Sequence, residues 1–297
     1  MSEPILQISP LGTRWQTQDP FLFCVHHIDT YPPGNERLGP AASLAGHHIG
    51  QDFEGRDGWR MYHGDVVPGF PQHPHRGFET VTFILEGELS HLDSGGHESV
   101  IHTGGIQWMT AGSGLVHAEL SPESFKRRGG PLEILQLWIN LPARLKMTAP
   151  AYRGLEAADL PKVALPGGAG RLTLVSDRWG DRAGPIEPIA DIRLMLVELA
   201  AGGRVDVPVD RGRTIFLYIV RGKAEIAGTE AEKWSLAELD QEGDGVSLSS
   251  ADGALILFGH AAPFGEPIVS HGPFVMNSRE EIVQAIRDYQ AGRFGTL

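Results

Sequence analysis

The chain has 297 residues and a net charge of -12, because 37 Asp and Glu outnumber 25 Lys and Arg, and this argues against direct nucleic-acid binding. The basic run from Lys126 to Arg128 is interpreted as a solvated loop. Cys24 is the only cysteine, so an internal disulfide and a thiolate metal cluster are excluded. The sequence has neither a signal-peptide pattern nor an apolar run of membrane-spanning length, so we expect a cytoplasmic protein that binds no membrane.

Short apolar runs separated by glycines and prolines predict a protein built mainly of strands. The chain contains 38 Gly and 21 Pro, a punctuation typical of β-sandwiches and β-barrels. The expected strands are Phe21–His26, Val81–Leu85, Glu88–Asp93, Ser99–His102, Ile106–Thr110, Leu132–Ile139, Leu172–Val175, Ile192–Glu198, Thr214–Val220, Ala224–Ala227 and Ala254–Phe258. An Asp-Ser-Gly-Gly segment that starts at Asp93 predicts a hairpin turn.

The sequence further predicts two related lobes. Residues 146–170 are rich in Ala, Pro and Gly, and we interpret them as a linker with little regular structure. The segment Thr214–Gly228 has the same order of features as Thr80–Asp93: an apolar strand, a charged residue beside Gly, and a second strand. We therefore expect one lobe over residues 1–145 and a second over residues 171–277.

The C-terminal residues 278–297 predict a helix followed by a short tail. Ser278 and Glu281 have the spacing of a capping box, and apolar residues then recur at helical spacing. Gly292 suits the left-handed stop after a last turn. The pattern predicts an amphipathic helix from Arg279 to Ala291 that docks on a β lobe.

Two short pairs predict a metal site in the first lobe: His73 with His75, and His117 with Glu119. Residues two apart on a strand point to the same face. If the pairs lie on neighbouring strands, three imidazoles and one carboxylate converge on a divalent transition metal, for which iron(II) is the first candidate and Mn, Ni, Cu and Zn are alternatives. The competing interpretation is a set of scattered surface histidines.

Glu79 competes with Glu119 for the acidic position, since it follows His75 by four residues. It would need a strand that stays regular past Gly77, and a glycine there indicates a bend. Glu119 shares a strand face with His117 and directly supplies the fourth ligand beside the three histidines. We therefore prefer Glu119 as the ligand on the residues alone.

The chain has other histidines, and 11 of its 13 lie in the first 120 residues. The adjacent pairs His26–His27 and His47–His48 cannot supply both members to one metal, because neighbours on a strand face opposite ways. His63 is a further candidate for lining the pocket. The remaining histidines are expected to face solvent (His91, His97, His102) or to lack partner ligands (His260, His271).

These residues resemble the cupin superfamily and, within it, the pirin family. Cupin strand pairs carry a His-x-His-x(3–4)-Glu motif, found here as HPHRGFE from His73 to Glu79, and a Pro-x-Gly-x-x-His motif, found here with Gly112 in the proline position. The likeness to pirins extends over HPHRGFETVTFILEGELSHLDS, GGIQWMTAGSGLVHAE, LQLWINLPARLKMTAPAY and GEPIVSHGPFVMNSREEIVQAIRDYQAGRFG, and so covers nearly the whole chain.

The resemblance implies an all-β bicupin with two β-barrel, jelly-roll lobes, metal in the N-terminal lobe alone, and a C-terminal helix that packs back on that lobe. The ligands it implies are His73, His75, His117 and Glu119, which leaves Glu79 near the pocket. His260 begins a short segment, His-Ala-Ala-Pro-Phe, that differs from the more glycine-rich sequence of relatives at this place.

Two functions follow from the resemblance. The first is a quercetin 2,3-dioxygenase that opens a flavonol or related small aromatic substrate with O2, with Glu119 or Glu79 as the base. Phe53, Trp59, Phe78, Trp108 and Met109 are the candidate pocket walls. The second is a non-catalytic, iron- and redox-dependent partner of a transcription factor or metabolic enzyme. The resemblance also favours a monomer.

Overall fold

The computed structural model of the protein describes residues 5–10, 14–61 and 69–297. The chain divides into two compact units, each built from two separate stretches of sequence. Unit 1 comprises Met1–Phe23 and Ala158–Gly265, and unit 2 comprises Cys24–Ala157 and Glu266–Leu297. The start of the chain thus belongs with its second half, and the end of the chain belongs with its first. The lobes expected from the sequence, residues 1–145 and 171–277, were continuous segments and did not include this exchange of the chain ends.

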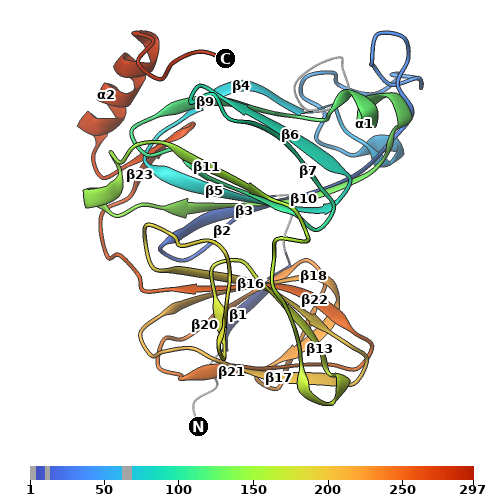
Figure 1. The fold of residues 1–297 in the computed structure, drawn as a ribbon, viewed down its shortest axis with the longest axis vertical. Helices are drawn as coiled ribbons and strands as arrows, with labels where there is room; N and C mark the ends of the chain where they lie inside the picture. The colour runs from blue at the N-terminus through green and yellow to red at the C-terminus, as the bar shows by residue number, and fades with distance from the viewer. Residues whose placement is uncertain (1–4, 11–13, 62–68) are drawn as a thin grey trace. The chain divides into compact units, whose positions relative to one another are not determined.

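Unit 2 contains a small sheet near the C-terminus and two large antiparallel sheets, which are drawn one over the other in Figure 1. Their strands are β3 (Phe21–Tyr31), β4 (Gly69–His75), β5 (Phe78–Glu86), β6 (Glu88–Asp93), β7 (Glu98–His102), β8 (Ile106–Thr110), β9 (Leu115–Leu120), β10 (Gly130–Asn140) and β11 (Ala151–Leu155). One sheet has the order β11-β8-β5-β10-β3 and the other has the order β4-β9-β6-β7. The short strand β2 (Arg14–Gln16) precedes β3 in the chain.

Strand β5 shows why these sequences form strands. It lies between β8 and β10, and its residues from Phe78 to Ile84 are all buried. A strand that is covered on both faces has no solvent-exposed side on which polar residues alternate. This explains the nearly continuous run of aromatic and β-branched residues in β5. Buried side chains of this unit form a core cluster that includes Ile84, Leu89 and Ile101.

Unit 1 is a second antiparallel β structure. Its strands are β1 (Ile5–Pro10), β12 (Lys162–Ala164), β13 (Gly170–Leu174), β14 (Arg178–Trp179), β15 (Arg182–Ala183), β16 (Ile192–Leu199), β17 (Gly203–Pro208), β18 (Thr214–Ile226), β19 (Thr229–Glu232), β20 (Ser235–Leu239), β21 (Gly245–Ser250) and β22 (Ala254–Ala261). Its main sheet follows the path β1-β20-β18-β22-β16-β13-β12, and β17 pairs with β21. Residues of β17 alternate between buried and exposed, as expected of a strand with one face on the core.

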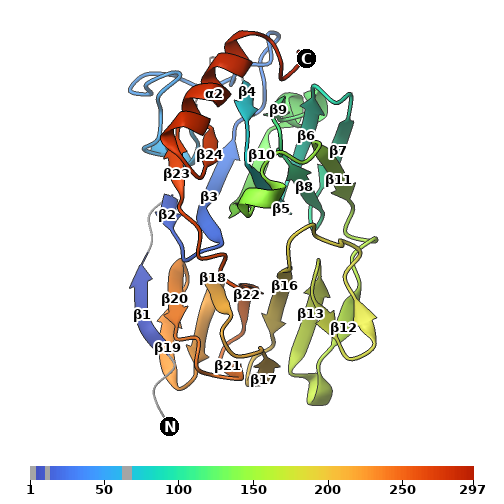
Figure 2. The same cartoon turned by 90° about the vertical axis from the view of Figure 1, so that its left-hand side faces the viewer.

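The predicted C-terminal helix is confirmed as α2 (Arg279–Gln290). Ser278 accepts a hydrogen bond from the Glu281 amide, and the Glu281 carboxylate accepts one from the Ser278 amide, which is the expected capping box. The helix packs on β23 (Val269–His271) and β24 (Phe274–Met276), as Figure 2 shows. All of these elements belong to unit 2, so the helix packs on the N-terminal lobe as the resemblance implied.

Two local expectations were wrong. Residues 146–170 contain β11 and β12, whose backbones pair with β8 and β13, so the segment is not a structureless linker. The basic run at Lys126 was expected in a loop, but it forms the last turn of α1 (Glu123–Arg128), where cations favour the negative end of the helix. Short 3-10 turns lie at Arg56–Gly58, Ala143–Leu145 and Pro166–Gly168. No helix in the described part of the chain is both long and apolar enough to cross a membrane.

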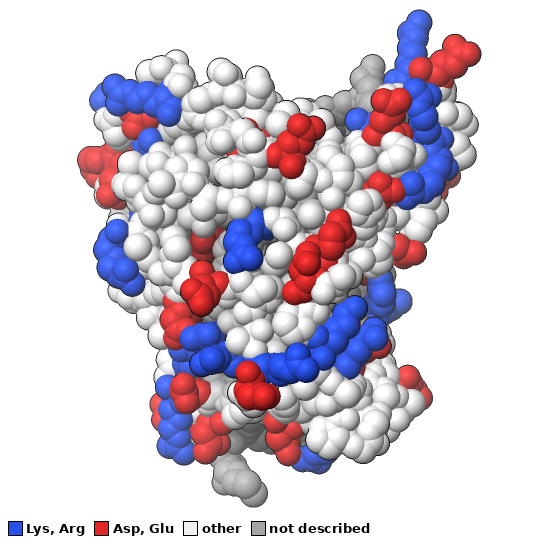
Figure 3. Space-filling model, in the orientation of Figure 1, with Lys and Arg blue, Asp and Glu red and all other residues white. Residues whose placement is uncertain are grey.

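Charged side chains of both signs are interspersed on the face drawn in Figure 3. Exposed ion pairs within unit 1 include Arg171 with Glu198 at 2.7 Å and Lys223 with Glu230 at 2.6 Å. Exposed pairs contribute only about 0–1 kcal/mol each. The stability of this unit therefore depends mainly on its buried apolar cluster, to which Leu217 and Phe258 contribute.

Candidate metal centre

The two predicted ligand pairs lie on neighbouring antiparallel strands, β4 and β9. His73 is directly opposite His117 in the register, and His75 is opposite Leu115. A bulge between Phe70 and His73 adds one residue to β4. Phe70 therefore lies opposite Glu119, although it precedes His73 by three residues and Glu119 follows His117 by two. The strand pairing that the metal-site hypothesis required is therefore present.

The three imidazoles converge. One ring nitrogen from each of His73, His75 and His117 lies within 4.8 Å of the others. Ring centroids are 4.3 Å apart for His73 and His117, 4.7 Å for His73 and His75, and 4.9 Å for His75 and His117. His75 and His117 are buried, and His73 is partly exposed. Among the described residues, these three histidines form the group whose ligand atoms lie close enough together to hold a metal ion.

The hydrogen bonds of the triad fit a metal ion. Both ring nitrogens of His117 are buried, and neither has a hydrogen-bond partner. The Nδ1 atoms of His73 and His75 lie 2.7 Å and 3.4 Å from the carbonyl oxygens of Pro71 and Pro273. A carbonyl oxygen only accepts, so Nδ1 carries the proton in both rings and Nε2 is left as the ligand atom. A cation coordinated at this point would satisfy one of the two His117 nitrogens.

The protonation state of the triad suits coordination. Burial lowers the pKa of His75 well below its ordinary value, and the neighbouring His73 lowers it further. Burial also lowers the pKa of His117, with further contributions from His75 and His73. Neutral imidazole is the form that binds metal, so these two rings need lose no proton at neutral pH before a cation enters.

Glu119 lies beside the triad but is held by other groups. Its carboxylate accepts hydrogen bonds from the Thr82 hydroxyl at 3.2 Å and from the Gln136 amide at 2.7 Å. The cluster of ligand atoms within 4.8 Å of one another consists of the three imidazoles, without this carboxylate. Coordination by Glu119 therefore stays a prediction, and it would require the side chain to turn from Gln136 toward the histidines.

Glu79 lies elsewhere in the barrel interior. One carboxylate oxygen accepts hydrogen bonds from the Trp108 indole at 3.1 Å and the Thr110 hydroxyl at 2.6 Å, and the other oxygen is buried without a partner. Burial raises the pKa of Glu79, and the two hydrogen bonds offset part of this rise. The bend expected at Gly77 is present, since its φ is +87° between β4 and β5.

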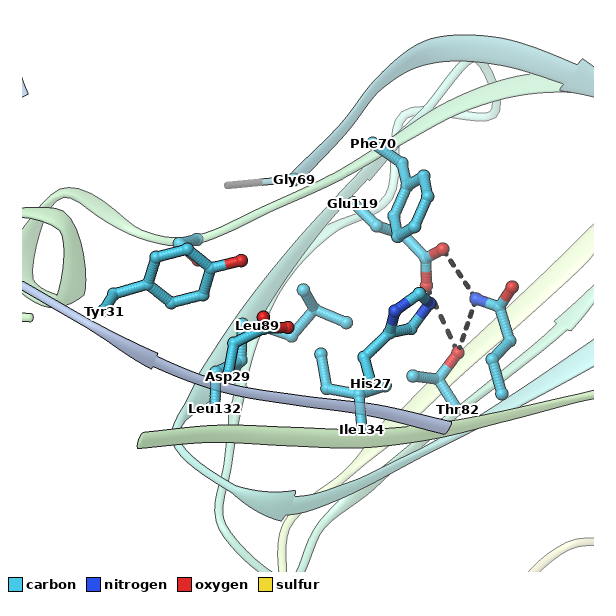
Figure 4. A pocket seen from close by; sticks show the side chains of 12 residues that line it. His27, Asp29, Tyr31, Gly69, Phe70, Thr82, Leu89, Glu119, Leu132 and Ile134 are labelled. Carbon is cyan, nitrogen blue, oxygen red and sulfur yellow. Dashed lines mark hydrogen bonds between the residues drawn. The ribbon is translucent and has the colours of Figure 1, made fainter. Parts of the chain in front are cut away.

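A small pocket of about 30 Å³ lies beside Glu119. Figure 4 shows Glu119, Thr82 and His27 at one end, and Asp29 and Tyr31 at the other. The apolar side chains of its wall are Phe70, Leu89, Leu132 and Ile134. This volume holds about two water molecules and is far below the roughly 300–1,000 Å³ of a formed small-molecule site, so an aromatic ligand would enter only if side chains moved.

Phe70 lines the pocket and also contacts the triad. Its ring centroid is 6.4 Å from that of His73 and 5.5 Å from that of His27. None of the five aromatic or methionine side chains expected as walls is among the residues that line this pocket. Of those five, Phe78 contacts the metal site directly, with its ring 5.0 Å from that of His75.

The expectation that His91 faces solvent was wrong. Its exposed fraction is 2%, its ring stacks on Tyr152 at 4.0 Å, and its Nε2 lies 3.0 Å from an Asp93 carboxylate oxygen. Leu89, His91 and Asp93 alternate along β6 and share its buried face, a period-2 signal that the sequence carried. His97 and His102 are substantially exposed, as expected. His63 lies outside the described residues.

The adjacent histidine pairs divide between two environments. His26 is buried against Glu133 at 3.0 Å, whereas His27 lines the pocket. His47 is buried, with Nδ1 2.6 Å from Asp52 and its ring stacked on Trp59 at 4.1 Å. These contacts give His26 and His47 roles in packing rather than in metal binding.

Comparisons with known proteins agree with this geometry. The family model described as Pirin matches residues 10–139, and the one described as Pirin C-terminal cupin domain matches residues 194–295. A "Pirin-like protein" of Caulobacter vibrioides is 43% identical over 231 residues, which cover 77% of this chain and 82% of that protein. A Pseudomonas aeruginosa protein named "Putative quercetin 2,3-dioxygenase" is 41% identical over 226 residues, or 76% of this chain and 79% of the relative.

Solved structures show the same likeness. A quercetin 2,3-dioxygenase from Acinetobacter baumannii has a TM-score of 0.82 at 29% identity, and the match covers 98% of both chains. A bacterial pirin from Escherichia coli in complex with nickel(II) has a TM-score of 0.58 at 21% identity, with 84% of this chain and 85% of that chain covered. The second likeness concerns the fold alone.

Proposed function

This chain belongs to the pirin family of bicupins, and from that premise we propose that it is a metal-dependent dioxygenase acting on a flavonol or a related hydroxylated aromatic compound. The observation that carries the proposal is the triad of His73 and the buried His75 and His117, which lies beside a pocket that contains the Glu119 carboxylate. Relatives named as quercetin 2,3-dioxygenases support the substrate class.

The three histidines would hold one divalent transition metal, and Glu119 is the proposed fourth ligand. Imidazole nitrogens with one carboxylate suit iron(II), our first choice, and also Mn, Ni, Cu or Zn. When bound, the ion supplies a positive charge that lowers the pKa of a coordinated hydroxyl group. Three neutral rings and one carboxylate leave room on such an ion for substrate and O2.

Glu119 is the proposed proton acceptor for the substrate hydroxyl. It lines the pocket, whereas Glu79 does not and instead accepts hydrogen bonds from Trp108 and Thr110. Thr82 and Gln136 donate to the Glu119 carboxylate and orient it toward the pocket. Proton transfer by a positioned carboxylate contributes about 10²- to 10⁴-fold to rate.

Once side chains move apart to admit a substrate, the pocket walls would hold the aromatic rings and exclude water. Leu89, Leu132 and Ile134 provide apolar surface, while His27 and Asp29 offer polar contacts for substrate hydroxyl groups. The reaction would place both atoms of O2 in the opened product and release carbon monoxide. It therefore balances without an added reductant.

The test is to load the purified protein anaerobically with iron(II), manganese(II), nickel(II) or copper(II), and then to add quercetin and O2. We expect flavonol loss and carbon monoxide release with at least one metal, and neither with His117→Ala. His97→Ala, which removes a half-exposed histidine of the same lobe, is the matched control. Metal binding without turnover by any loaded form would overturn the dioxygenase proposal and favour the regulatory alternative. The expected monomer and the cytoplasmic location stay predictions.

A further inference from the structure

The C-terminal segment Glu266–Leu297 contacts the metal centre from outside. Its Pro273 carbonyl accepts from Nδ1 of His75 at 3.4 Å, and it also accepts from the Arg76 amide at 3.3 Å. In return, the Val275 amide donates to the Arg76 carbonyl at 3.0 Å. The backbone that carries His75 is thus paired with a segment from the far end of the chain, and that segment supplies the acceptor for the ring.

Arg76 fastens the two ligand strands to helix α2. Its side chain is buried; Nε donates to the Ser113 carbonyl at 2.7 Å, and a terminal nitrogen donates to Asp288 on α2 at 2.8 Å. Ser113 lies in the turn that leads into β9, and Arg76 directly follows His75 at the end of β4. One guanidinium therefore connects the ends of both strands to a single carboxylate of the C-terminal helix.

Two further contacts complete the attachment. The Phe294 ring lies under the Arg76 guanidinium, 4.6 Å from centroid to carbon, and its side chain leaves no room for a Cβ at Gly114. The buried Lys146 ammonium donates to the carbonyls of Gly77 and Val275 at 2.9 Å and 3.0 Å. The turn after His75 is therefore held between α2, the tail and β24.

We propose that Asp288 and Phe294 are positioning residues for the metal centre, and that the docked C-terminal segment fixes the orientation of His75 and so raises metal affinity. The physical reason is that a ligand imidazole binds best when an acceptor on its other nitrogen fixes the ring, and loss of such outer contacts costs about 10- to 100-fold in affinity. Asp288 acts through Arg76, and Arg76 in turn holds Pro273 and the start of β9. The inference rests on the proposed metal centre but not on the dioxygenase activity.

The test measures cobalt(II) affinity and the cobalt absorption spectrum in the full-length protein. Asp288→Asn removes the negative charge that Arg76 contacts. Phe294→Leu removes the aromatic ring that packs against the Arg76 guanidinium. The control Glu280→Gln removes the same charge from an exposed position of the same helix. Each variant is compared well below its own unfolding temperature, with circular dichroism as the check on folding.

We expect a loss of cobalt affinity of about 10-fold or more in Asp288→Asn, a smaller loss in Phe294→Leu, and a changed ligand-field spectrum in both. The control should keep the wild-type affinity and spectrum. Wild-type affinity and spectrum in both folded variants would overturn the inference while leaving the metal centre intact. Absence of cobalt binding by the wild-type protein would overturn the metal centre and this inference together. Neither outcome depends on whether the protein turns over a flavonol.

Discussion

His73 and His117 face each other across β4 and β9, with ring centroids 4.3 Å apart. They lie far apart in the sequence, yet the antiparallel register places them in one pair, with His75 completing the triangle. Both nitrogens of His117 are buried without a hydrogen-bond partner. A metal ion bound to one of these nitrogens would remove part of the cost of burying them, which links metal binding to stability.

His75→Ala should strip the metal while leaving the fold largely intact. The change removes one of three imidazoles, whereas the sheets around it remain paired through their backbones. Metal content by mass spectrometry after dialysis and far-ultraviolet circular dichroism are the two measurements. Stoichiometric metal in this variant would show that the ligand assignment is wrong.

Glu119→Gln should retain metal on the three histidines but lower kcat about 100-fold or more, because the amide cannot accept the substrate proton. The substitution preserves the shape of the side chain, and Thr82 can still donate to its amide oxygen. Single-turnover flavonol oxidation with the metal content measured in parallel is the assay. Turnover at the wild-type rate would rule Glu119 out as the base.

Glu79→Gln should leave both metal content and turnover near wild type. The amide oxygen can still accept from Trp108 and Thr110, and burial already raises the pKa of the carboxyl it replaces. The free energy of unfolding should change by less than about 1.5 kcal/mol, the net contribution of one typical hydrogen bond. If this variant loses turnover and Glu119→Gln does not, the two carboxylates have the reverse roles.

Asp93 should make folding sensitive to acid. Burial alone would raise its pKa, but hydrogen bonds from His91 and from the His97 amide and ring lower the pKa to about 2. A carboxyl with a pKa below its unfolded value of about 4 stabilises the fold fully above that pH, and the contribution is lost as pH falls from about 4 toward 2. Urea unfolding of Asp93→Asn and wild type at pH 7 and pH 3 measures this.

The stability difference between Asp93→Asn and wild type should be about 1.5–3 kcal/mol at pH 7, as for a hydrogen-bonded charge, and smaller at pH 3. Leu92→Gln, an exposed neighbour on the same strand, is the control and should show no such pH dependence. An equal difference at both pH values would contradict the shifted pKa of Asp93.

Some elements could be predicted because their signals are local. The C-terminal helix followed from the Ser278 capping box and the glycine after its last turn, and both are present. Strands β6 and β8 were predicted with the bounds that the structure shows, since short apolar runs between turns mark them. Strand β4 was missing from the predicted strands because its sequence, GFPQHPH, has two prolines and little apolar character.

The motifs of the sequence by themselves determined the family of the chain, and i, i+2 spacing predicted the three converging histidines, because it fixes which side chains of a strand share a face. Only the tertiary structure decided the surroundings: that Glu119 is held by Thr82 and Gln136, and that Pro273 contacts His75. Such contacts join residues far apart in the chain, and local propensities carry no information about which of these distant partners will meet.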